Sequence, residues 1–436
     1  MENKIALFWF RRDLRLDDNA GFSHALKGDC PVLPLFIFDS DILEELPQHD
    51  ARVTFIHETL QRMRDRLQDK FGSSIAMYHG RPEDIFKELL QNYEVQQVYT
   101  NHDYEPYAKE RDKKIAALLQ ERSIPFTSFK DQVIFEKDEV VKDDGDPYVV
   151  YTPYKNKWKS LFDKKEHLVS YDTEAHFGNL VKHSRLPNLS LSDIGFRTAS
   201  IKVPEFTVTP SLIENYEATR NFPAKENGTS RLGPHLRFGT VSIRKMMKKA
   251  IAEDNEAFWS ELIWREFFMQ ILWHFPHTAK KAFRSKYDRI EWRNNENEFE
   301  KWKNGETGYA LVDAGMRELN QTGYMHNRVR MLVASFLCKH LLIDWRWGEA
   351  YFAEKLLDYD QSANVGNWQW AAGSGVDAAP YFRIFNPMTQ IDKFDKQKEY
   401  IRQWVPDLQE LTYPQKMVDH KMARERCLKT YKEAVS

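Results

Sequence analysis

The first 130 residues alternate short apolar runs with charged, amphipathic segments, and this alternation restricts the fold more than any other feature of the chain. Apolar runs of this length predict buried strands. They are KIALFWF (4–10), VLPLFIF (32–38), SIAMYH (74–79), VQQVYT (95–100) and IPFTSF (124–129). Because helices between successive strands return the chain across a sheet, the alternation predicts a parallel sheet with right-handed crossovers.

The segments between these runs predict helices over residues 52–70, 82–92 and 106–122. Pro82 and Pro106 stand where the first turn of a helix accepts proline. No GxGxxG motif follows the first strand, so the usual dinucleotide fingerprint is absent. The carboxyl edge of such a sheet is still the place where a small ligand is held.

The remaining chain divides by composition. Residues 131–205 lack periodicity and contain DDGDP, YTPY and clusters of Ser, Pro and Asn, which indicates a long connection between domains. The pattern is helical from residue 206 onward. We therefore predict an α/β domain over 1–130, an interdomain connection over 131–205 and an all-α domain over 206–436.

Composition excludes several classes of protein. No apolar run is as long as a membrane span, and the N-terminus does not have the pattern of a signal peptide. Cysteine occurs only at 30, 338 and 427, without a CxxC pair, which argues against disulfides and zinc. We expect a cytoplasmic protein, a monomer without a bound metal or a membrane partner.

Charge is divided unevenly between the two parts of the chain. Residues 210–436 carry 34 Lys and Arg against 30 Asp and Glu, whereas the rest is acidic. The imbalance allows a local basic patch that binds nucleic acid but does not require one.

The segment 229–242, TSRLGPHLRFGTVS, predicts an anion site. Thr229, Ser230 and Arg231 precede an apolar helical segment, and hydroxyls, backbone N–H groups and an arginine together bind phosphate well. A simple capped helix with a surface arginine explains the same pattern.

The segment 256–275 predicts a helix with polar groups among aromatic ones. Glu261, Trp264, Arg265 and Phe268 share one stripe at helical spacing. Burying a carboxylate and an arginine is costly without partners. The stripe is either an ion pair at the edge of a core or the floor of a cavity for a flat ligand.

The segment 323–343 predicts a helix that presents Asn327, Arg330 and Met331 on one face, with Arg328 pointing elsewhere. A buried asparagine amide needs hydrogen-bond partners, whereas a methionine is more often core than site. His326 is interpreted as a structural hydrogen bonder, since no HExxH or other metal-ligand spacing occurs.

Tryptophan is concentrated in one region. Nine of the 12 tryptophans lie between Trp259 and Trp370, and packing is the default interpretation for each. Two of them, Trp368 and Trp370, follow a segment in which Asp358 and Asp360 are expected to end a helix. The run AAGSG after them permits close backbone approach to a ligand, and an arginine in YFRIF (381–385) is a candidate phosphate contact.

Six segments together resemble the photolyase/cryptochrome family, and most closely the class I cyclobutane pyrimidine dimer photolyases. They span almost the whole chain and occur in the family's order, which makes the resemblance specific. They are FRRDLRLDDN (10–19), TSRLGPHLRFG (229–239), SELIWREFF (260–268), GYMHNRVRM (323–331), DWRWGEAYF (344–352) and NWQWAAGSGVDAAPYFRIFNP (367–387).

The resemblance implies an N-terminal Rossmann-like α/β antenna domain and a helical domain that binds one FAD. The residues implied around its phosphates and ribityl chain are Tyr216, Thr229, Ser230, Arg231 and Leu232, with Phe258 also in contact with the cofactor. Around the isoalloxazine ring the resemblance implies Arg330, Asp358 and Asp360, with Asn364 facing flavin N5.

The resemblance also implies a lesion site, a DNA surface and an electron path. Glu261 and Asn327 would hydrogen-bond a thymine dimer between apolar walls of Trp264, Met331 and Trp370. The arginines implied at DNA phosphates are Arg220, Arg265, Arg328 and Arg383. The implied electron path is Trp368, Trp345 and Trp292, whereas Trp259, Trp273 and Trp302 are interpreted as core.

The implied activity is light-dependent repair of cyclobutane pyrimidine dimers, in which photoexcited reduced FAD passes an electron to a dimer flipped out of DNA. The alternatives are a (6-4) photolyase, a cryptochrome-like photoreceptor and a flavin-free nucleotide-binding protein. Members with (6-4) activity carry histidines in place of Asn327 and Met331, and plant-like cryptochromes carry Asp in place of Asn364.

An antenna chromophore is the least defined part of the resemblance. Folate-binding members have Asn-Glu where this chain has Tyr107-Ala108, although Lys280 matches a folate-contacting lysine. Folate, a deazaflavin, another flavin and no antenna all remain open.

Overall fold

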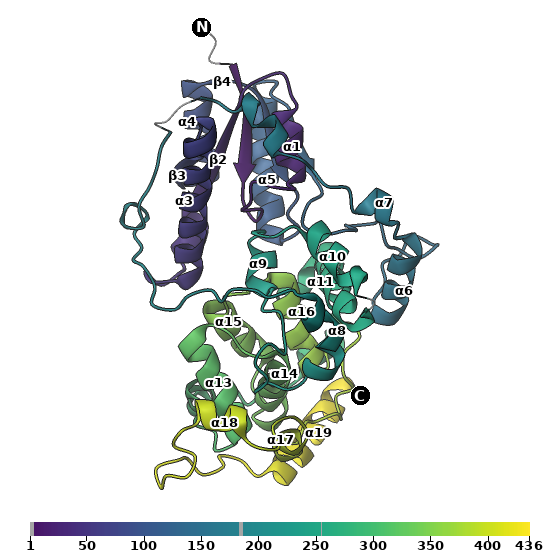
Figure 1. Ribbon diagram of the computed structural model, residues 1–436. Helices are drawn as coiled ribbons and strands as arrows, with labels where there is room; N and C mark the ends of the chain where they lie inside the picture. Colours follow the sequence, from purple (N-terminus) through teal and green to yellow (C-terminus); the bar gives the residue numbers. More distant parts are fainter. Residues whose placement is uncertain (1–3, 183–185, 254) are drawn as a thin grey trace. The chain divides into compact units, whose positions relative to one another are not determined.

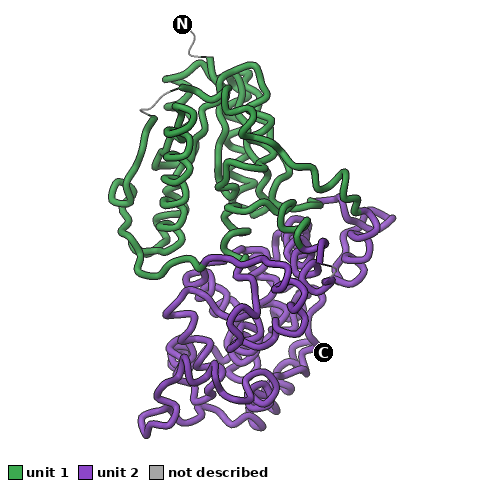
Figure 2. The backbone as a smooth tube through the Cα atoms, in the orientation of Figure 1, with its two compact units in different colours: residues 1–136, 162–204, 232–249 green, residues 137–161, 205–231, 250–436 purple. Residues whose placement is uncertain are grey.

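The computed structural model describes residues 4–182, 186–253 and 255–436, so the first three residues of the expected α/β domain lie outside it. The chain forms two compact units, each assembled from separate stretches (Figure 2). Unit 1 comprises residues 1–136, 162–204 and 232–249, and unit 2 comprises residues 137–161, 205–231 and 250–436. The segment 131–205, which the sequence predicted as a connection, is therefore shared between both units.

Unit 1 contains the predicted parallel sheet. All strand pairs are parallel and the strand order is β3-β2-β1-β4-β5. Strands β2, β3 and β4 are labelled in Figure 1. The strands are β1 (Lys4–Phe10), β2 (Val32–Asp39), β3 (Ala76–Gly80), β4 (Glu94–Asn101) and β5 (Phe126–Phe129). The α/β prediction is thus confirmed, and each predicted strand is present within two residues of its expected bounds.

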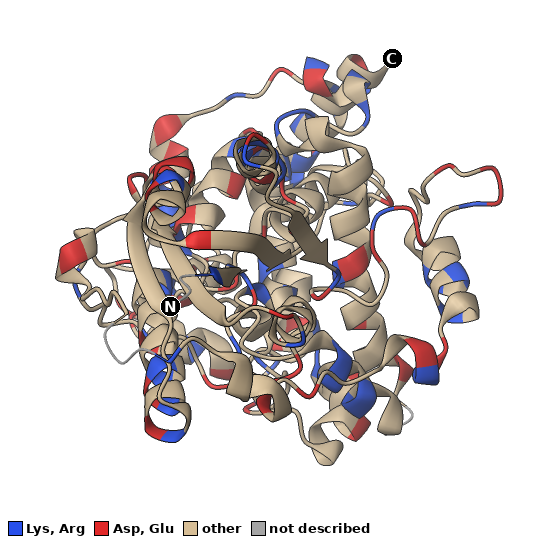
Figure 3. Cartoon of the chain, turned by 90° about the horizontal axis from the view of Figure 1, so that it is seen from above, with Lys and Arg blue, Asp and Glu red and all other residues tan. Residues whose placement is uncertain are grey.

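Both faces of this sheet are buried, because alternate residues of each strand pack against different helices. Phe8 and Phe10 pack with α1 and α3 on one face, and Trp9 packs with α4 and α5 on the other. The strands are accordingly almost free of charged residues (Figure 3). The covering helices are α1 (Ala20–Leu26), α3 (Ala51–Phe71), α4 (Pro82–Asn92) and α5 (Pro106–Gln120), and α2 (Ser40–Leu43) is a single turn after β2.

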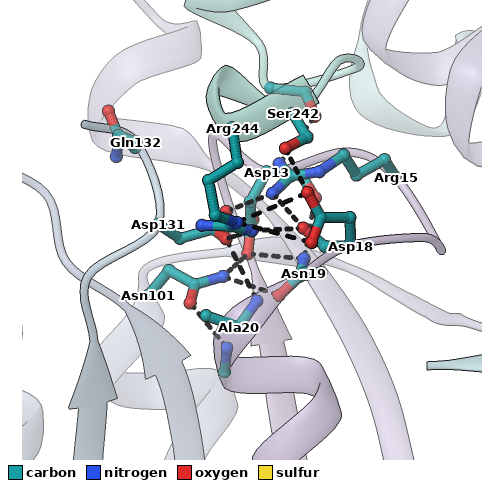
Figure 4. A network of polar contacts seen from close by, with 12 residues as sticks. Asp13, Arg15, Asp18, Asn19, Ala20, Asn101, Asp131, Gln132, Ser242 and Arg244 are labelled. Atoms are coloured by element: carbon teal, nitrogen blue, oxygen red, sulfur yellow. Dashed lines mark hydrogen bonds and ion pairs between the residues drawn. The ribbon is translucent and has the colours of Figure 1, made fainter. Parts of the chain in front are cut away.

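A buried polar network closes the carboxyl edge of the sheet between β1 and β4 (Figure 4). The Asn101 amide donates to Asp13 Oδ2 at 2.5 Å and to Asn19 Oδ1 at 2.8 Å. Asp131 accepts from Arg15 at 2.6 Å and from Arg244 at 2.9 Å. Charged groups are buried at low cost only when they are paired, so the network explains most of the motif FRRDLRLDDN as structural.

The rest of unit 1 is irregular. Its short helices are α7 (Lys164–His167), η1 (Glu174–Asn179), η2 (Ser192–Ile194) and α9 (Gly233–Arg237), and α10 (Ile243–Ala252) begins in unit 1.

Unit 2 is helical, as predicted, and includes a helix that sequence periodicity did not reveal, α6. Its elements are α6 (Tyr151–Leu161), α8 (Pro210–Thr219), α11 (Glu256–His274), η3 (Pro276–Ala279), η4 (Ser285–Arg289), α12 (Glu296–Asn304), α13 (Ala310–Thr322), α14 (Asn327–Ser335), the π-helical turn η5 (Phe336–His340), α15 (Trp345–Lys355), α16 (Gln361–Ala372), α17 (Pro387–Phe394), α18 (Glu399–Trp404) and α19 (His420–Val435). Every helix in the described ranges is too short or too polar to cross a bilayer.

Two glycines let the central helices of unit 2 approach closely. A Cβ on Gly348 of α15 would lie 2.1 Å from the Trp368 ring, and one on Gly366 of α16 would lie 2.3 Å from Phe268 of α11. No side chain larger than glycine fits at either position. These contacts hold α11, α15 and α16 together around the candidate site.

Candidate active site

A cavity of about 600 Å³ lies among α14, α15 and α16, and we call it the α14–α16 cavity. Its lining comes from three helices and from the loop between α15 and α16. The predicted site residues that line it are Asn327, Arg330, Met331, Asp358, Asp360, Asn364, Trp368 and Trp370. The structure therefore brings residues assigned to a lesion and residues assigned to a flavin ring into one space.

An ion pair forms one wall of this cavity. Arg330 donates to both oxygens of Asp358, at 3.0 and 2.8 Å, and its Nε donates to Met325 O at 2.7 Å. Burial acts to lower the pKa of Arg330, but Asp358 outweighs it and the pKa is raised. The pair presents a fixed arrangement of donors and acceptors toward the cavity.

The two aspartates are positioned differently from the prediction that both end a helix. α15 ends at Lys355, and Asp358 lies in the following loop. Asp360 begins the next helix instead, because it is the N-cap of α16 and accepts from Ala363 N at 3.2 Å. An aspartate is among the best N-cap residues, which the sequence argument overlooked.

Asn364 is held by a residue that sequence reasoning missed. Its amide nitrogen donates to Glu349 Oε1 at 2.8 Å and to Glu349 O at 3.1 Å. Glu349 lies on α15, and burial raises the pKa of its carboxyl group. This pairing fixes the rotation of the Asn364 amide at the cavity wall.

A second cavity, of about 630 Å³, is lined by Thr229, Ser230 and Arg231 together with Tyr324 and His326. Arg231 has a φ of 53°, a left-handed conformation that is strained for a non-glycine residue. The helix after this segment, α9, has only five residues, so the side chains and not a helix terminus define the site.

His326 is the polar group in this second cavity that most requires a ligand. Its Nδ1 accepts from Arg328 N at 3.1 Å, but within the described ranges its buried Nε2 has no hydrogen-bond partner. Burial and the charges of Arg330 and Arg328 lower its pKa to about 4. Tyr324 lies beside it under two guanidinium groups, with Arg231 at 5.9 Å and Arg330 at 5.4 Å from the ring centre.

A third set of predicted site residues, Tyr216, Arg220 and Phe258, lies together on α8, at the end of α8 and on α11. The rings of Tyr216 and Phe258 meet edge-to-face at 5.0 Å, and Arg220 lies 5.5 Å over Tyr216. Arg220 also forms an ion pair with Glu261. Burial raises the pKa of Glu261, although Arg220 acts in the opposite direction. Leu232, predicted for the same cofactor, is buried and belongs to unit 1.

Two of the remaining predicted arginines, Arg328 and Arg383, lie beside aromatic side chains. Arg328 lies 4.4 Å from the centre of the Phe394 ring and donates to Asn221. Burial and the positive charges of Arg220 and Arg383 lower the pKa of Arg328. Arg383 is exposed beside Phe385, and Arg265 is half-buried on α11. Arg220, Arg328 and Arg383 are therefore close enough for their positive charges to act on one another.

The predicted electron path lies in one core. Trp368 and Trp345 are each 2 % exposed, and Trp292 packs half-buried against the same cluster. The Trp368 ring contacts Phe352 at 5.0 Å and Trp302 at 6.2 Å. Trp302, which the sequence interpretation treated as core, is thus also a direct ring neighbour of Trp368.

Comparison with known proteins identifies the family. Residues 6–171 match the model described as DNA photolyase, and residues 258–412 match the FAD binding domain of DNA photolyase. A deoxyribodipyrimidine photo-lyase from Synechococcus is 37 % identical over 98 % of this chain and 96 % of its own length. The chain belongs to the DNA photolyase family.

Solved structures agree with this assignment. A class III photolyase from Agrobacterium tumefaciens is 33 % identical, with a TM-score of 0.88 over 100 % of this chain and 98 % of its own. An archaeal photolyase from Sulfolobus tokodaii is 32 % identical, with a TM-score of 0.81 over 98 % and 99 %. That protein is described with two FAD molecules and a novel light-harvesting cofactor.

This photolyase is an enzyme with an FAD-binding domain, and the α14–α16 cavity and the second cavity described above fit that cofactor. The second cavity offers hydroxyls and Arg231 for phosphates and an unsatisfied His326 Nε2 within the described residues. The α14–α16 cavity offers Arg330 and Asp358, whose paired donors and acceptors match the polar edge of a flavin ring.

Unit 1 of the photolyase contains a cavity of its own, of about 840 Å³, at the carboxyl ends of β1 and β2. Its walls include Trp9 and Phe36, and Arg12 binds Asp103 at its rim. Tyr107 donates to Asp39 Oδ2 at 2.6 Å, so the position where folate-binding relatives carry Asn lines this cavity. Lys280, the other residue compared with folate sites, belongs to unit 2.

Proposed function

We propose that this chain repairs cyclobutane pyrimidine dimers in DNA under blue light. One observation carries the proposal: Asn327, Met331 and Trp370 line the same cavity as Arg330 and Asp358. A lesion and a flavin ring bound there would be in contact, which is the arrangement that electron transfer between them requires. The amide and thioether at 327 and 331 replace the histidines of (6-4) enzymes.

The cofactor would be held by the α14–α16 cavity and by the second cavity around Thr229, Ser230 and Arg231. When bound and reduced, FAD supplies the photoexcited electron donor. Arg330 and Asp358 would hold the polar edge of its ring, with Asn364 in the role that the resemblance implies at N5, and Asp360 would fix the start of α16. Thr229, Ser230 and Arg231 would hold the phosphates. Tyr216 and Phe258 of unit 2 would contact the cofactor as the family resemblance implies, and the role of Leu232 stays a prediction.

The lesion would be oriented by the chain's own polar and apolar groups. The Asn327 amide pairs with the polar edge of the dimer, while Met331, Trp370 and Trp264 exclude water from its faces. Burial raises the pKa of Glu261, whereas its ion pair with Arg220 acts to lower it. As a carboxylate Glu261 would accept from an N–H group of the dimer, and as the neutral acid it would donate to a dimer carbonyl and stabilise negative charge there.

DNA would be bound through phosphate contacts around the flipped-out dimer. Arg220, Arg328 and Arg383 raise the positive potential together, and Arg265 extends the surface along α11. Such contacts release counterions, so binding to damaged DNA should weaken as salt rises.

Light-dependent repair tests this function directly. Anaerobically reduced protein is mixed with an oligonucleotide that carries one thymine dimer, and dimer loss is followed with and without blue light. Dimer loss only in the light supports the proposal. Repair of an oligonucleotide with a (6-4) lesion instead, or no repair by protein whose flavin photoreduces, would refute it and indicate a (6-4) enzyme or a cryptochrome-like photoreceptor.

We also propose that the unit 1 cavity holds a second chromophore. Its aromatic walls and charged rim suit a flat ring system such as a deazaflavin, a flavin or a folate. Absorption and mass spectra of chromophores released by heat would identify it. Ile37→Trp should fill the cavity and abolish that chromophore while FAD remains, and a Trp variant that retains it would exclude this site.

A further inference from the structure

We infer that Tyr151 is a positioning residue for Trp264, and that it fixes the plane of the indole against which the lesion packs. The two rings are stacked almost in parallel, with centroids 3.5 Å apart and an angle of 8° between their planes. This inference rests on the proposed function, in which Trp264 forms one wall of the lesion site. Tyr151 comes from YTPY (151–154), a motif that the sequence predicted to lie in a connection.

Tyr151, the first residue of α6, is fixed against α11 by a hydrogen bond of its side chain. Its hydroxyl group donates to Ser260 O at 2.8 Å, one turn before Trp264. The side chain is 6 % exposed, and its backbone N–H donates to Asp377 at 3.4 Å. A ring anchored at both its hydroxyl and its backbone has little freedom to rotate away from the indole.

The surrounding contacts leave part of Trp264 accessible. Tyr151 covers the opposite face, while Phe267 meets the indole edge-on at 5.6 Å and Phe268 lies at 5.6 Å with a 25° tilt. Trp264 is nevertheless only half-buried. The accessible part of the indole therefore lies outside the face that Tyr151 covers.

The helix that carries Tyr151 is bound to α11 at further points. Trp158 donates to Glu266 Oε2 at 2.6 Å, and Gln270 donates to Tyr148 O at 2.8 Å. Lys155 and Lys159 both bind Glu256, at 2.8 and 2.9 Å. α6 is thus fixed along α11 by several contacts. Its first residue, Tyr151, sets the orientation of the Trp264 indole in the protein without DNA.

Preorganisation of this kind improves affinity because binding no longer has to immobilise the ring. Loss of the stacked pair corresponds to about a 3- to 10-fold weaker affinity for dimer-containing DNA. Affinity for undamaged DNA, which relies on phosphate contacts, should not change. Tyr151→Phe keeps the stacked ring but loses the hydroxyl anchor, so it should weaken affinity less than a variant without the aromatic ring.

The test is a double-mutant cycle between Tyr151→Met and Trp264→Ala, read as binding in the dark of an oligonucleotide with one thymine dimer to the FAD-loaded protein. Methionine keeps the volume of the site but removes the aromatic face. If Tyr151 acts through Trp264, Tyr151→Met weakens binding in the original protein and has no further effect beside Trp264→Ala.

Tyr154→Leu is the matched control, because Tyr154 is also buried on α6 and packs on Phe267 at 5.3 Å. It should lower thermal stability at least as much as Tyr151→Met without the loss of dimer affinity. An equal loss of affinity in both Trp264 backgrounds, or with Tyr154→Leu, would overturn the inference. If Trp264→Ala alone leaves dimer binding unchanged, the lesion site of the proposed function is wrong, and the positioning role is wrong with it. If Tyr151→Met fails to fold, Tyr151→Leu, which also removes the aromatic face, supplies the readout in the same cycle.

Discussion

Removing the negative charge of Asp358 should destabilise unit 2 measurably even without FAD. Asp358 and Arg330 form a two-point ion pair whose side chains are 13 % and 22 % exposed. Breaking a fully buried pair by removing one partner costs about 3–5 kcal/mol, because the remaining charge is left without compensation. Since solvent still reaches both groups here, we expect about 2–3 kcal/mol for Asp358→Asn.

The assay is guanidinium unfolding of the apoprotein, followed by tryptophan fluorescence. Most of the tryptophans lie in unit 2, so the signal reports on the unit that carries the substitution. Asp358→Asn should lower the midpoint and leave the slope unchanged. The pair of Lys303 and Glu300 provides the control because its carboxylate is 59 % exposed, and Glu300→Gln should change stability by less than about 0.5 kcal/mol.

A double substitution separates charge from packing. Arg330→Met with Asp358→Leu removes both charges at similar volume, and it should cost less than Asp358→Asn alone because no buried charge remains. A double variant less stable than the single one, or an Asp358→Asn midpoint equal to that of the original protein, would refute this reasoning. FAD affinity should fall in both variants, because both alter the cavity wall.

Further predictions concern electron transfer, pH, DNA and packing. Trp368→Phe should slow photoreduction of oxidised FAD but spare repair by chemically reduced protein; unchanged photoreduction would disprove the proposed path. The pKa of His326 is lowered to about 4, so unfolded chains bind its proton first and stability should fall as pH decreases from about 6.5 to about 4. His326→Asn, which keeps an N-cap acceptor, should flatten that pH dependence in unfolding titrations. Arg383→Gln should weaken DNA binding and reduce the salt slope by about 1, and an unchanged slope would remove Arg383 from the phosphate contacts. Gly348→Ala places a Cβ 2.1 Å from the Trp368 ring and should cost about 1–3 kcal/mol in unfolding experiments.

The sequence predicted most accurately the features that repeat along the chain. Strand-helix alternation was sufficient for the parallel sheet, and Pro82 and Pro106 begin α4 and α5 as expected. Helical spacing likewise places Arg330 and Met331 of α14 in one cavity. Strand and helix positions and shared helix faces depend on neighbours within a few residues, so the local periodicity of the sequence is sufficient to predict them.

The connection over 131–205 shows where periodicity fails. α6 has the aromatic residues Tyr151, Tyr154 and Trp158 on its buried side, but a short helix with only three such positions gives a weak pattern. The prediction that Asp360 ends a helix was wrong because the local pattern was again ambiguous. An aspartate between two helices is consistent with the end of one helix or with the start of the next, and Asp360 begins α16.

The sequence by itself determined the fold class, the order of the elements and which residues share a helix face. Only the tertiary structure decided which distant groups meet: Glu349 with Asn364, Arg220 with Glu261, and Tyr151 with Trp264. A helix repeats every 3.6 residues, so its faces follow from spacing alone. Contacts between helices depend instead on how closely backbones approach, and Gly348 and Gly366 control that approach through contacts that no local pattern records.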